Sequence, residues 1–214
     1  MRISQRFFLG AKSRFPLYLF LVVPPQKRMP LQSGLVTAGF LNKILPKFLT
    51  LISKIFTNMF TIRKATPKDT PIIFDLIKKL AVYEKLENEV VTSVEELREQ
   101  IFEKKFAHVI IGEENGIPAG FALYFYNFST FVGKPGLYLE DLYIEPEHRG
   151  KGYGKTLLIE LTKIAKAENC GRMEWSVLNW NTPAIDFYKS LQAKPMEEWS
   201  VYRLDQKGIA DLAE

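Results

Sequence analysis

Residues 137–167 read LYLEDLYIEPEHRGKGYGKTLLIELTKIAKA, and this stretch decides the fold. Its first part, Leu137–Ile144, is rich in leucine, tyrosine and isoleucine, which is typical of a β-strand. Three glycines between Gly150 and Gly154 then predict a tight turn. Beyond the turn, leucine, isoleucine and alanine recur at helical spacing, which predicts an amphipathic helix. The unit is therefore a strand, a glycine-rich turn and a helix.

The segments around this unit supply the remaining elements of one α/β domain. The periodicity predicts the order β-α-α-β-β-β-α-β-α-β. The other expected elements are a strand over Phe60–Ala65, helices beginning near Asp69 and Ser93, strands over Val109–Glu113 and Ile117–Tyr126, a strand over Arg172–Leu178, a helix over Pro183–Leu191 and a last strand over Trp199–Leu204. The pair Asn115-Gly116 is a strong β-hairpin signal. Hairpins favour antiparallel neighbours and strand–helix–strand crossovers favour parallel ones, so we expect a mixed sheet with helices on both faces.

The charge of the chain is divided unevenly along the sequence. Of 214 residues, 29 are lysine or arginine and 24 are aspartate or glutamate, a net charge of +5. Residues 1–58 contain nine of the basic residues and none of the acidic ones, so residues 59–214 keep 20 basic against 24 acidic side chains, a net of −4. A net negative domain lacks the positive face that phosphate neutralisation needs, which argues against nucleic-acid binding. The composition predicts a basic N-terminal extension (residues 1–58) and a mildly acidic domain (residues 59–214).

The N-terminal extension is compatible with three interpretations, which the sequence leaves open. In the first, translation starts at Met59 and the extension is weakly ordered or non-native. In the second it is a targeting peptide, and in the third it is a membrane-surface anchor. The apolar stretch Phe15–Val23 is too short to span a bilayer. Apolar residues between Phe40 and Ile55 recur at the spacing of an amphipathic helix, so any membrane contact is expected only through residues 1–58.

Few residues suit metal or disulfide chemistry. The chain has one cysteine, Cys170, which cannot form an internal disulfide. With two histidines, His108 and His148, the candidate ligands are too few and too scattered for a zinc site. We therefore expect no metal cofactor.

The turn Arg149–Gly154 is a candidate phosphate-binding loop. Backbone N–H groups at the start of a helix are unpaired, carry the positive end of the helix dipole and bind phosphate oxygens. Glycine lets the backbone approach a diphosphate without an intervening Cβ, and Arg149 and Lys151 add positive charge. From these residues alone, a simple structural turn is the alternative. The nucleotide P-loop motif does not fit, because it needs glycine where Arg149 stands.

Three motifs together resemble the GNAT superfamily of acetyltransferases, and within it the spermidine/spermine and thialysine acetyltransferases. These motifs are Arg149-x-x-Gly152-x-Gly154, the run Leu137–Asp141, and Trp180-Asn181-x-Pro183-x-x-x-Phe187-Tyr188-Lys189. The resemblance covers about residues 61–204 and extends to the order of elements, so the GNAT acyl-CoA N-acyltransferase fold is expected. It departs at Gln192, where the family has glycine, because a glycine there suggests a left-handed helix end.

This resemblance implies a function, a co-substrate and an assembly. It implies direct transfer of the acetyl group of acetyl-CoA to a primary amine of a small cationic substrate, which is a diamine, a polyamine or a lysine-like amino acid. It also implies a homodimer in the cytoplasm, or in an organelle if residues 1–58 are a transit peptide. Two other functions stay open, namely acetylation of a protein amine and a non-catalytic acyl-CoA-binding module with a membrane-surface leader.

Acetyl transfer to an amine needs a base near the amine and an acid near the departing thiolate. Glu140 is the expected base. Strand alternation places it on one face with apolar neighbours such as Leu142, which partly desolvates it, while Asp141 points to the other face. Tyr188 is the expected acid, and the resemblance implies that Glu140 contacts the amine and deprotonates it through water. From the residues alone, Glu140 could instead be an ion-paired acid at the edge of the core, and Tyr188 could instead be a tyrosine of the core.

The resemblance further implies which residues contact each substrate. For acetyl-CoA these are the strand backbone of Leu142, Tyr143 and Ile144 along the pantetheine arm, then Arg149, Gly150, Lys151, Gly152, Tyr153, Gly154 and Lys155 around the diphosphate, and Asn181, Thr182, Pro183 and Ala184 at the far end of the CoA site. For the amine they are Tyr83, Glu84, Glu140, Glu174, Trp175, Ser176 and Glu198. Acidic side chains suit a cationic substrate, although acids on a helix end are more often solvated surface.

A protein consisting of residues 59–214 is expected to acetylate amines as fast as the full chain. Every residue assigned a role lies between Tyr83 and Glu198, and the extension is entirely basic, whereas a cationic amine needs an acidic pocket. The two proteins are to be assayed side by side at equal concentrations of folded protein, with membrane partitioning measured in parallel. A tenfold loss of activity on truncation, with an unchanged circular dichroism spectrum, would show that the extension helps to build the site.

Overall fold

The computed structural model describes Pro46 and residues 59–214, so the predictions for the rest of the N-terminal extension lie outside the described residues. The strands are β1 (Phe60–Lys64), β2 (His108–Glu114), β3 (Ile117–Ser129), β4 (Lys134–Ile144) and β5 (Arg172–Trp175). The α-helices are α2 (Thr70–Glu84), α3 (Val94–Arg98), α4 (Tyr153–Ala167), α5 (Thr182–Ser190) and α6 (Gln206–Ala213). Short helical turns cover Pro67–Asp69, Glu87–Glu89, Glu99–Glu103 and Pro146–His148. The α/β class is confirmed, and so is the expected order as far as α5.

Local sequence signals act where they were expected. Ser93 caps α3, since its hydroxyl accepts a 3.1 Å hydrogen bond from the Glu96 backbone N–H while the Glu96 carboxylate accepts one from the Ser93 N–H. Asn115 and Gly116 both have positive φ, 55° and 80°, as the tight hairpin turn between β2 and β3 requires. These elements therefore form from short-range chemistry.

One five-stranded sheet, in the order β1-β2-β3-β4-β5, forms the centre of the domain. The first four strands are antiparallel neighbours, and β5 pairs in parallel with β4. That parallel pairing runs from Gly136 opposite Arg172 to Leu139 opposite Trp175. Within residues 59–214, the part of β4 beyond Leu139 has no strand partner on this edge. The two strands therefore separate halfway along β4 and open the sheet at this point.

A β-bulge in β4 interrupts the alternation of its side chains. Opposite β3, Leu123 pairs with Asp141 and Tyr124 pairs with Leu139, so Glu140 is the extra residue. Leu139 and Leu142 consequently pack on the same side of the sheet, although they are three residues apart. The expected grouping of Leu139 with Asp141 is wrong for this reason, because Asp141 lies opposite Leu123, whose side chain packs on the other face.

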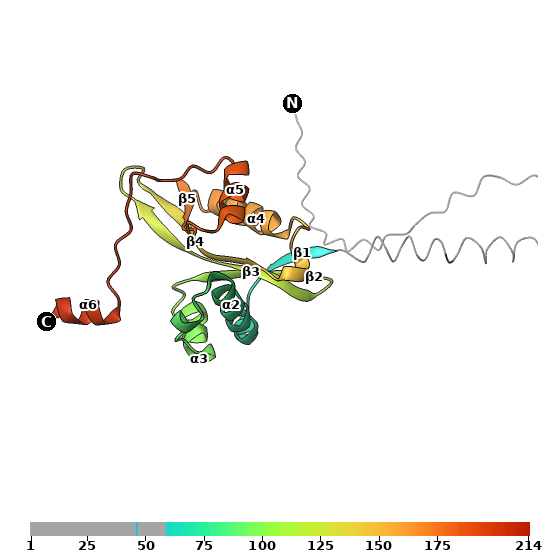
Figure 1. The fold of residues 1–214 in the computed structure, drawn as a ribbon, viewed down its shortest axis with the longest axis horizontal. Helices are drawn as coiled ribbons and strands as arrows, with labels where there is room; N and C mark the ends of the chain where they lie inside the picture. Colours follow the sequence, from blue (N-terminus) through green and yellow to red (C-terminus); the bar gives the residue numbers. More distant parts are fainter. Residues whose placement is uncertain (1–45, 47–58) are drawn as a thin grey trace, which may run out of the picture. The chain divides into compact units, whose positions relative to one another are not determined.

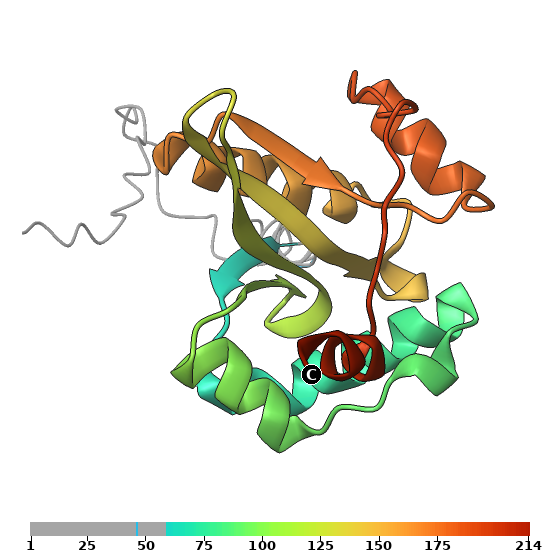
Figure 2. The same ribbon diagram turned by 90° about the vertical axis from the view of Figure 1, so that its left-hand side faces the viewer.

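Two hydrophobic clusters hold helices against opposite faces of the sheet. On one face, α2 packs Ile73 and Leu76 against Phe121, and all three side chains are at most 2% exposed. On the other face, α4 packs Leu157 and Leu161 against the sheet. Figure 1 shows α2 and α3 on one side of the strands and α4 and α5 on the other, and Figure 2 shows the same layers after a 90° turn. The helices cover both faces, as expected from the order of elements.

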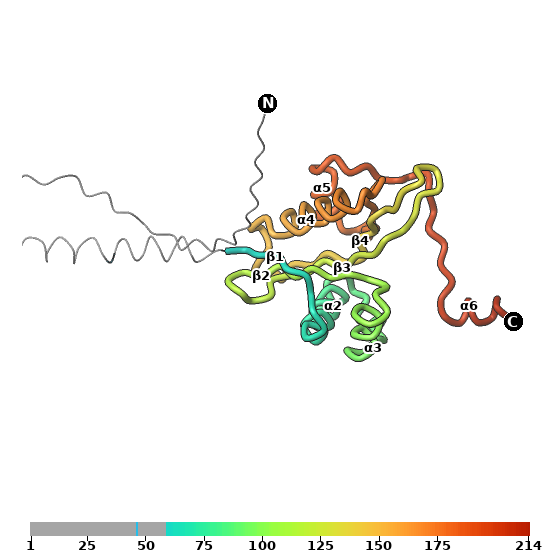
Figure 3. Tube along the Cα trace, turned by 180° about the vertical axis from the view of Figure 1, so that it is seen from behind, coloured from blue at the N-terminus to red at the C-terminus, as the bar shows by residue number. Residues whose placement is uncertain are grey.

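The C-terminal part of the chain differs from the prediction. Residues 199–204, expected to form a last strand, have no regular structure and lead to α6, which the sequence analysis did not predict (Figures 1 and 3). A strand needs a hydrogen-bonded neighbour, and none pairs with this segment in the described chain; its Val201 and Tyr202 are 85% and 93% exposed. At the end of α5, Gln192 has φ +65°, so it adopts the left-handed conformation that a glycine would favour.

None of the helices in the described part of the chain is long and apolar enough to cross a bilayer.

Candidate functional site

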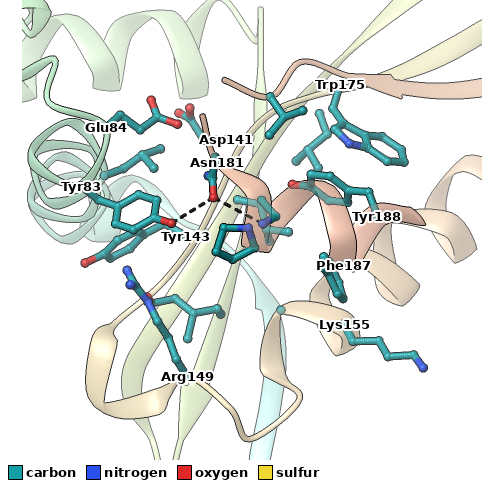
Figure 4. A pocket seen from close by; sticks show the side chains of 18 of the residues that line it. Tyr83, Glu84, Asp141, Tyr143, Arg149, Lys155, Trp175, Asn181, Phe187 and Tyr188 are labelled. Carbon is teal, nitrogen blue, oxygen red and sulfur yellow. Dashed lines mark hydrogen bonds between the residues drawn. The ribbon is translucent and has the colours of Figure 1, made fainter. Parts of the chain in front are cut away.

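A pocket of about 920 Å³ opens where β4 and β5 separate. Its walls are the end of α2, the second half of β4, the β4–α4 loop, the first residues of α4, the end of β5 and the inner face of α5 (Figure 4). Most of the expected site residues line it: Tyr83, Glu84, Glu140, Leu142, Tyr143, Ile144, Arg149, Gly150, Gly152, Tyr153, Gly154, Lys155, Trp175, Ser176, Asn181, Pro183, Ala184 and Tyr188. Segments 100 residues apart in the sequence thus meet in one cavity.

The glycine turn gives the pocket a wall of backbone. Gly150 and Gly152 have φ values of +74° and +83°, a region that side chains with a Cβ rarely adopt. Gly152 is the N-cap of α4, so the unpaired N–H groups of the first turn of this helix lie at the pocket wall. A helix N-terminus of this kind favours a phosphate group. The geometry fits the expected phosphate-binding loop.

The Arg149 side chain contacts both β4 and α2. Its Nε donates a 2.9 Å hydrogen bond to the backbone oxygen of Ile144, at the end of β4. Its guanidinium carbon is 4.7 Å from the ring centre of Tyr83 and 5.4 Å from that of Tyr143, which are cation–π distances (Figure 4). The side chain that opens the glycine motif therefore links the loop to α2 and β4.

Asn181 connects the two helices that face each other across the pocket. Its side-chain oxygen caps α5 by accepting a 3.3 Å hydrogen bond from the Ala184 backbone N–H. The same oxygen accepts a 3.1 Å hydrogen bond from the hydroxyl of Tyr83, near the end of α2 (Figure 4). The Asn181 side chain is buried, and its oxygen joins the end of α2 to the start of α5.

Three carboxylates, Glu84, Glu140 and Asp141, line one part of the pocket. Burial raises the pKa of Asp141 to about 7, with a further contribution from the negative charges of Glu140 and Glu84. Burial also raises the pKa of Glu84. Glu140 is exposed, so the desolvation that alternation predicted for it is found at Asp141 instead. The bulge at Glu140 is the physical reason, because it shifts the following residues to the opposite face.

Tyr188 faces these carboxylates from α5. Its ring packs against Trp175 at a centroid distance of 4.9 Å and against Phe187 at 5.3 Å (Figure 4). Burial raises the pKa of its hydroxyl above the usual value of 10, and the negative charge of Glu84 adds to the effect. Tyr188 therefore keeps its proton at neutral pH and can act as a proton donor.

Four expected contacts do not line the pocket. The Lys151 ammonium lies on Glu114, and Glu174 forms a 2.9 Å ion pair with Arg172. Thr182 and Glu198 are both exposed outside the pocket. Each was placed by its position along the chain relative to the family, and such a position does not say which way a side chain turns.

The pocket also contains residues that were not predicted from the sequence. These are Leu80, Leu139, Asp141, His148, Val177, Leu178 and Phe187. Asp141 could have been suspected, since it follows Glu140 directly in an otherwise apolar strand, but alternation assigned the desolvated position to Glu140. Across residues 59–214 no group of three His, Cys, Asp or Glu side chains is placed to hold a metal ion.

Comparison with known proteins identifies similar chains. Residues 74–192 match the acetyltransferase (GNAT) family. The thialysine N-epsilon-acetyltransferase of Bos taurus is 35% identical over 164 residues, which cover 71% of this chain and 96% of that protein. The L-ornithine N5-acetyltransferase NATA1 of Arabidopsis thaliana is 31% identical over 189 residues, covering 67% and 83%. A solved integron cassette protein from the V. cholerae mobile metagenome has a TM-score of 0.62 at 28% identity, covering 72% and 98%.

Asp141→Asn is expected to stabilise the protein at pH 8 and to have a much smaller effect at pH 4.5. The folded carboxyl titrates near pH 7 and the unfolded one near its ordinary value of 3.8, so folding takes up a proton between these values. The contribution of Asp141 to stability is therefore full below about pH 4 and is lost as the pH rises to 7, by a few kcal/mol. Asparagine does not titrate and avoids this loss.

Urea unfolding at both pH values measures the effect on the free energy of unfolding. Asp186→Asn is the matched control, since it makes the same change at an exposed side chain that does not contribute to the raised pKa of Asp141, and little change is expected at either pH. An equal effect of Asp141→Asn at pH 4.5 and pH 8 would contradict the assignment of a raised pKa to Asp141.

Proposed function

Because the chain belongs to the acetyltransferase (GNAT) family, as its motifs predicted, we propose that it transfers the acetyl group of acetyl-CoA to a primary amine of a small cationic substrate. One observation carries this proposal. The helix N-terminus at Gly152, the hydroxyl of Tyr188 and the three carboxylates Glu84, Glu140 and Asp141 line the same pocket. A phosphate-bearing donor and a cationic acceptor each have matching groups there.

The donor is proposed to lie along the opening between β4 and β5. Its diphosphate is expected on the turn around Gly150 and Gly152, where helix N–H groups are available. Over Leu142–Ile144, β4 pairs with β3 on one side and has no β5 partner on the other in the described chain. The Ile144 oxygen accepts a hydrogen bond from Arg149, and the other backbone polar groups on this open side are proposed to bond to the pantetheine amides. Acetyl-CoA would supply the activated thioester, and the protein would orient it toward the acidic part of the pocket.

The acceptor is proposed to enter at the three carboxylates. A primary amine with a pKa near 10.4 is almost fully protonated at pH 7, and it cannot attack a thioester until it loses a proton. Glu140 is exposed and can contact the cation and take up its proton through water. Its neighbour Asp141 has a pKa of about 7, which suits a proton acceptor at neutral pH. The adjacent pair is thus proposed to bind the cation and to accept its proton.

The names of the relatives support a small substrate. The relatives are named for thialysine and L-ornithine, both amino acids that carry a second amine. Three acids around one pocket suit a substrate with more than one positive charge. We therefore propose a diamine, a polyamine or a lysine-like amino acid. The family resemblance also supports the proposals of a homodimer and of a cytoplasmic location.

A panel of amines tests the proposed substrate class. Release of CoA from acetyl-CoA is measured with the full chain in the presence of diamines, polyamines, lysine-like amino acids, a lysine-containing peptide and a neutral monoamine. We expect the fastest release with the small dicationic amines. Faster release with the peptide would instead favour a protein acceptor, and no release with any amine would contradict the proposed reaction.

Tyr188→Phe is expected to lower turnover about 10²–10⁴-fold, the usual contribution of a general acid. The departing thiolate would lose its proton donor, while the ring packing on Trp175 is kept. The affinity for acetyl-CoA, measured by calorimetry, should not change. Tyr202→Phe is the matched control, because it removes the same hydroxyl from a side chain that is 93% exposed. An unchanged turnover number for Tyr188→Phe would exclude Tyr188 as the acid.

A further inference from the structure

Glu114 contacts the segment that carries the glycine turn but does not itself line the pocket. It is the last residue of β2 and is 8% exposed. Three side chains from the segment that carries the turn converge on its carboxylate: His148, Lys151 and Tyr153. The contact joins parts of the chain that are 34 to 39 residues apart in the sequence.

The contacts to this carboxylate are short and charged. The Lys151 ammonium donates hydrogen bonds of 3.0 and 2.9 Å to the two oxygens, and His148 Nδ1 lies 2.7 Å from Oε2. The Tyr153 hydroxyl donates a further hydrogen bond to Oε1. The bonds from Tyr153 and Lys151 lower the pKa of Glu114 to about 2, so the carboxylate stays ionised at neutral pH. Charge-assisted hydrogen bonds of this type are the stronger ones in proteins.

The neighbouring strand β1, which pairs with β2 at Glu114, contacts the same segment. The ring of Phe60, in β1, stacks on the ring of Tyr153 at 3.9 Å between centroids, with an interplanar angle of 9°. Tyr153 is the first residue of α4, so both its ring and its hydroxyl are held where the helix begins. Side chains of β1 and β2 therefore hold the N-terminus of α4 in position.

The turn consequently has two sides with different tasks. Lys151 and the hydroxyl of Tyr153 bond to Glu114, whereas Gly150 and Gly152 line the pocket, as do other atoms of His148 and Tyr153. Lys151 is not a pocket residue, so it does not supply the charge for the donor directly. Glu114 is itself an anion and would repel a diphosphate if it faced one. Its ion pair with Lys151 offsets that charge, and the contacts with Lys151 and His148 hold the backbone in place.

We infer that Glu114 is a positioning residue for the donor. Its contacts with His148, Lys151 and Tyr153 hold the backbone N–H groups of the turn in the arrangement that binds a diphosphate. This inference rests on the proposed function, because it takes acetyl-CoA as the donor. It adds a residue from β2 that neither the glycine motif nor the pocket contains. The role predicted is specific to the diphosphate and does not extend to the transfer step.

Glu114→Gln in the full chain tests this inference with two donors. Acetyl-CoA carries the diphosphate, and S-acetylpantetheine presents the same thioester without it. We expect the KM for acetyl-CoA and the Kd of free CoA, measured by calorimetry, to rise about tenfold, as loss of charge-assisted hydrogen bonds would produce. The kcat with saturating acetyl-CoA and the kcat/KM with S-acetylpantetheine should stay within about twofold of the wild type.

Glu113→Gln is the matched control, since it removes an ion pair with Arg63 from the preceding residue of the same strand. It should leave both donors unaffected. If Glu114→Gln does not fold by circular dichroism, Tyr153→Phe replaces it, because it removes one hydrogen bond to Glu114 and keeps the stack on Phe60. A smaller rise in the KM for acetyl-CoA is then expected, again with no effect on S-acetylpantetheine.

Three outcomes would overturn the inference. An equal loss with both donors would show that Glu114 acts only on stability or on the whole site. An unchanged Kd of CoA in a folded variant would show that the loop does not depend on Glu114. A wild-type protein that binds no CoA would refute the proposed donor together with the inference, and is thereby distinguished from the first two.

Discussion

The site depends on the separation of β4 from β5. Parallel pairing ends at Leu139 and Trp175, while β4 continues to Ile144. A sheet that stayed paired along its full length would bury these backbone groups and leave no space between the strands. Because the strands separate, the second half of β4 forms the floor of the pocket, α5 forms one wall, and the N-terminus of α4 closes one end (Figure 4).

A bulge in the same strand distributes the acidic groups. If β4 alternated regularly, Glu140 and not Asp141 would face the apolar surroundings. The extra residue at Glu140 leaves this side chain exposed and withdraws Asp141, whose pKa rises to about 7. Two adjacent carboxylates thus acquire different environments without any difference in their chemistry. One stays accessible to a cation, and the other holds a proton near neutral pH.

Most of the positive charge around the glycine turn is already engaged in internal contacts. The Lys151 ammonium is paired with Glu114, which also contacts His148, and the guanidinium of Arg149 lies over two tyrosine rings. What the turn offers to the pocket is mainly backbone, oriented by positive φ at two glycines and by the first turn of α4. Such a surface recognises an anion through directed N–H groups, and fixed dipoles of this kind need no rearrangement when a ligand binds.

The sequence by itself determined the elements whose signals are local. The hairpin at Asn115-Gly116, the cap at Ser93 and the helix that follows Gly152 each depend on residues a few positions apart, and all three form as predicted. The motifs around Gly152 and Tyr188 were also sufficient for the family and for most of the pocket lining. Turns, helix caps and sequence motifs can be predicted from the sequence without knowing which strands pair.

Only the tertiary structure decided which way several side chains turn and which strands pair. Alternation along β4 failed at Asp141 because a bulge is a property of two strands, and the pattern of one strand does not reveal it. The expected strand over residues 199–204 has the right residues but no neighbour in the described chain, so it stays irregular. Lys151 reads as a phosphate ligand in its motif, yet Glu114, 37 positions earlier, takes its charge. Contacts between residues this far apart depend on the packed sheet, which a linear pattern does not contain.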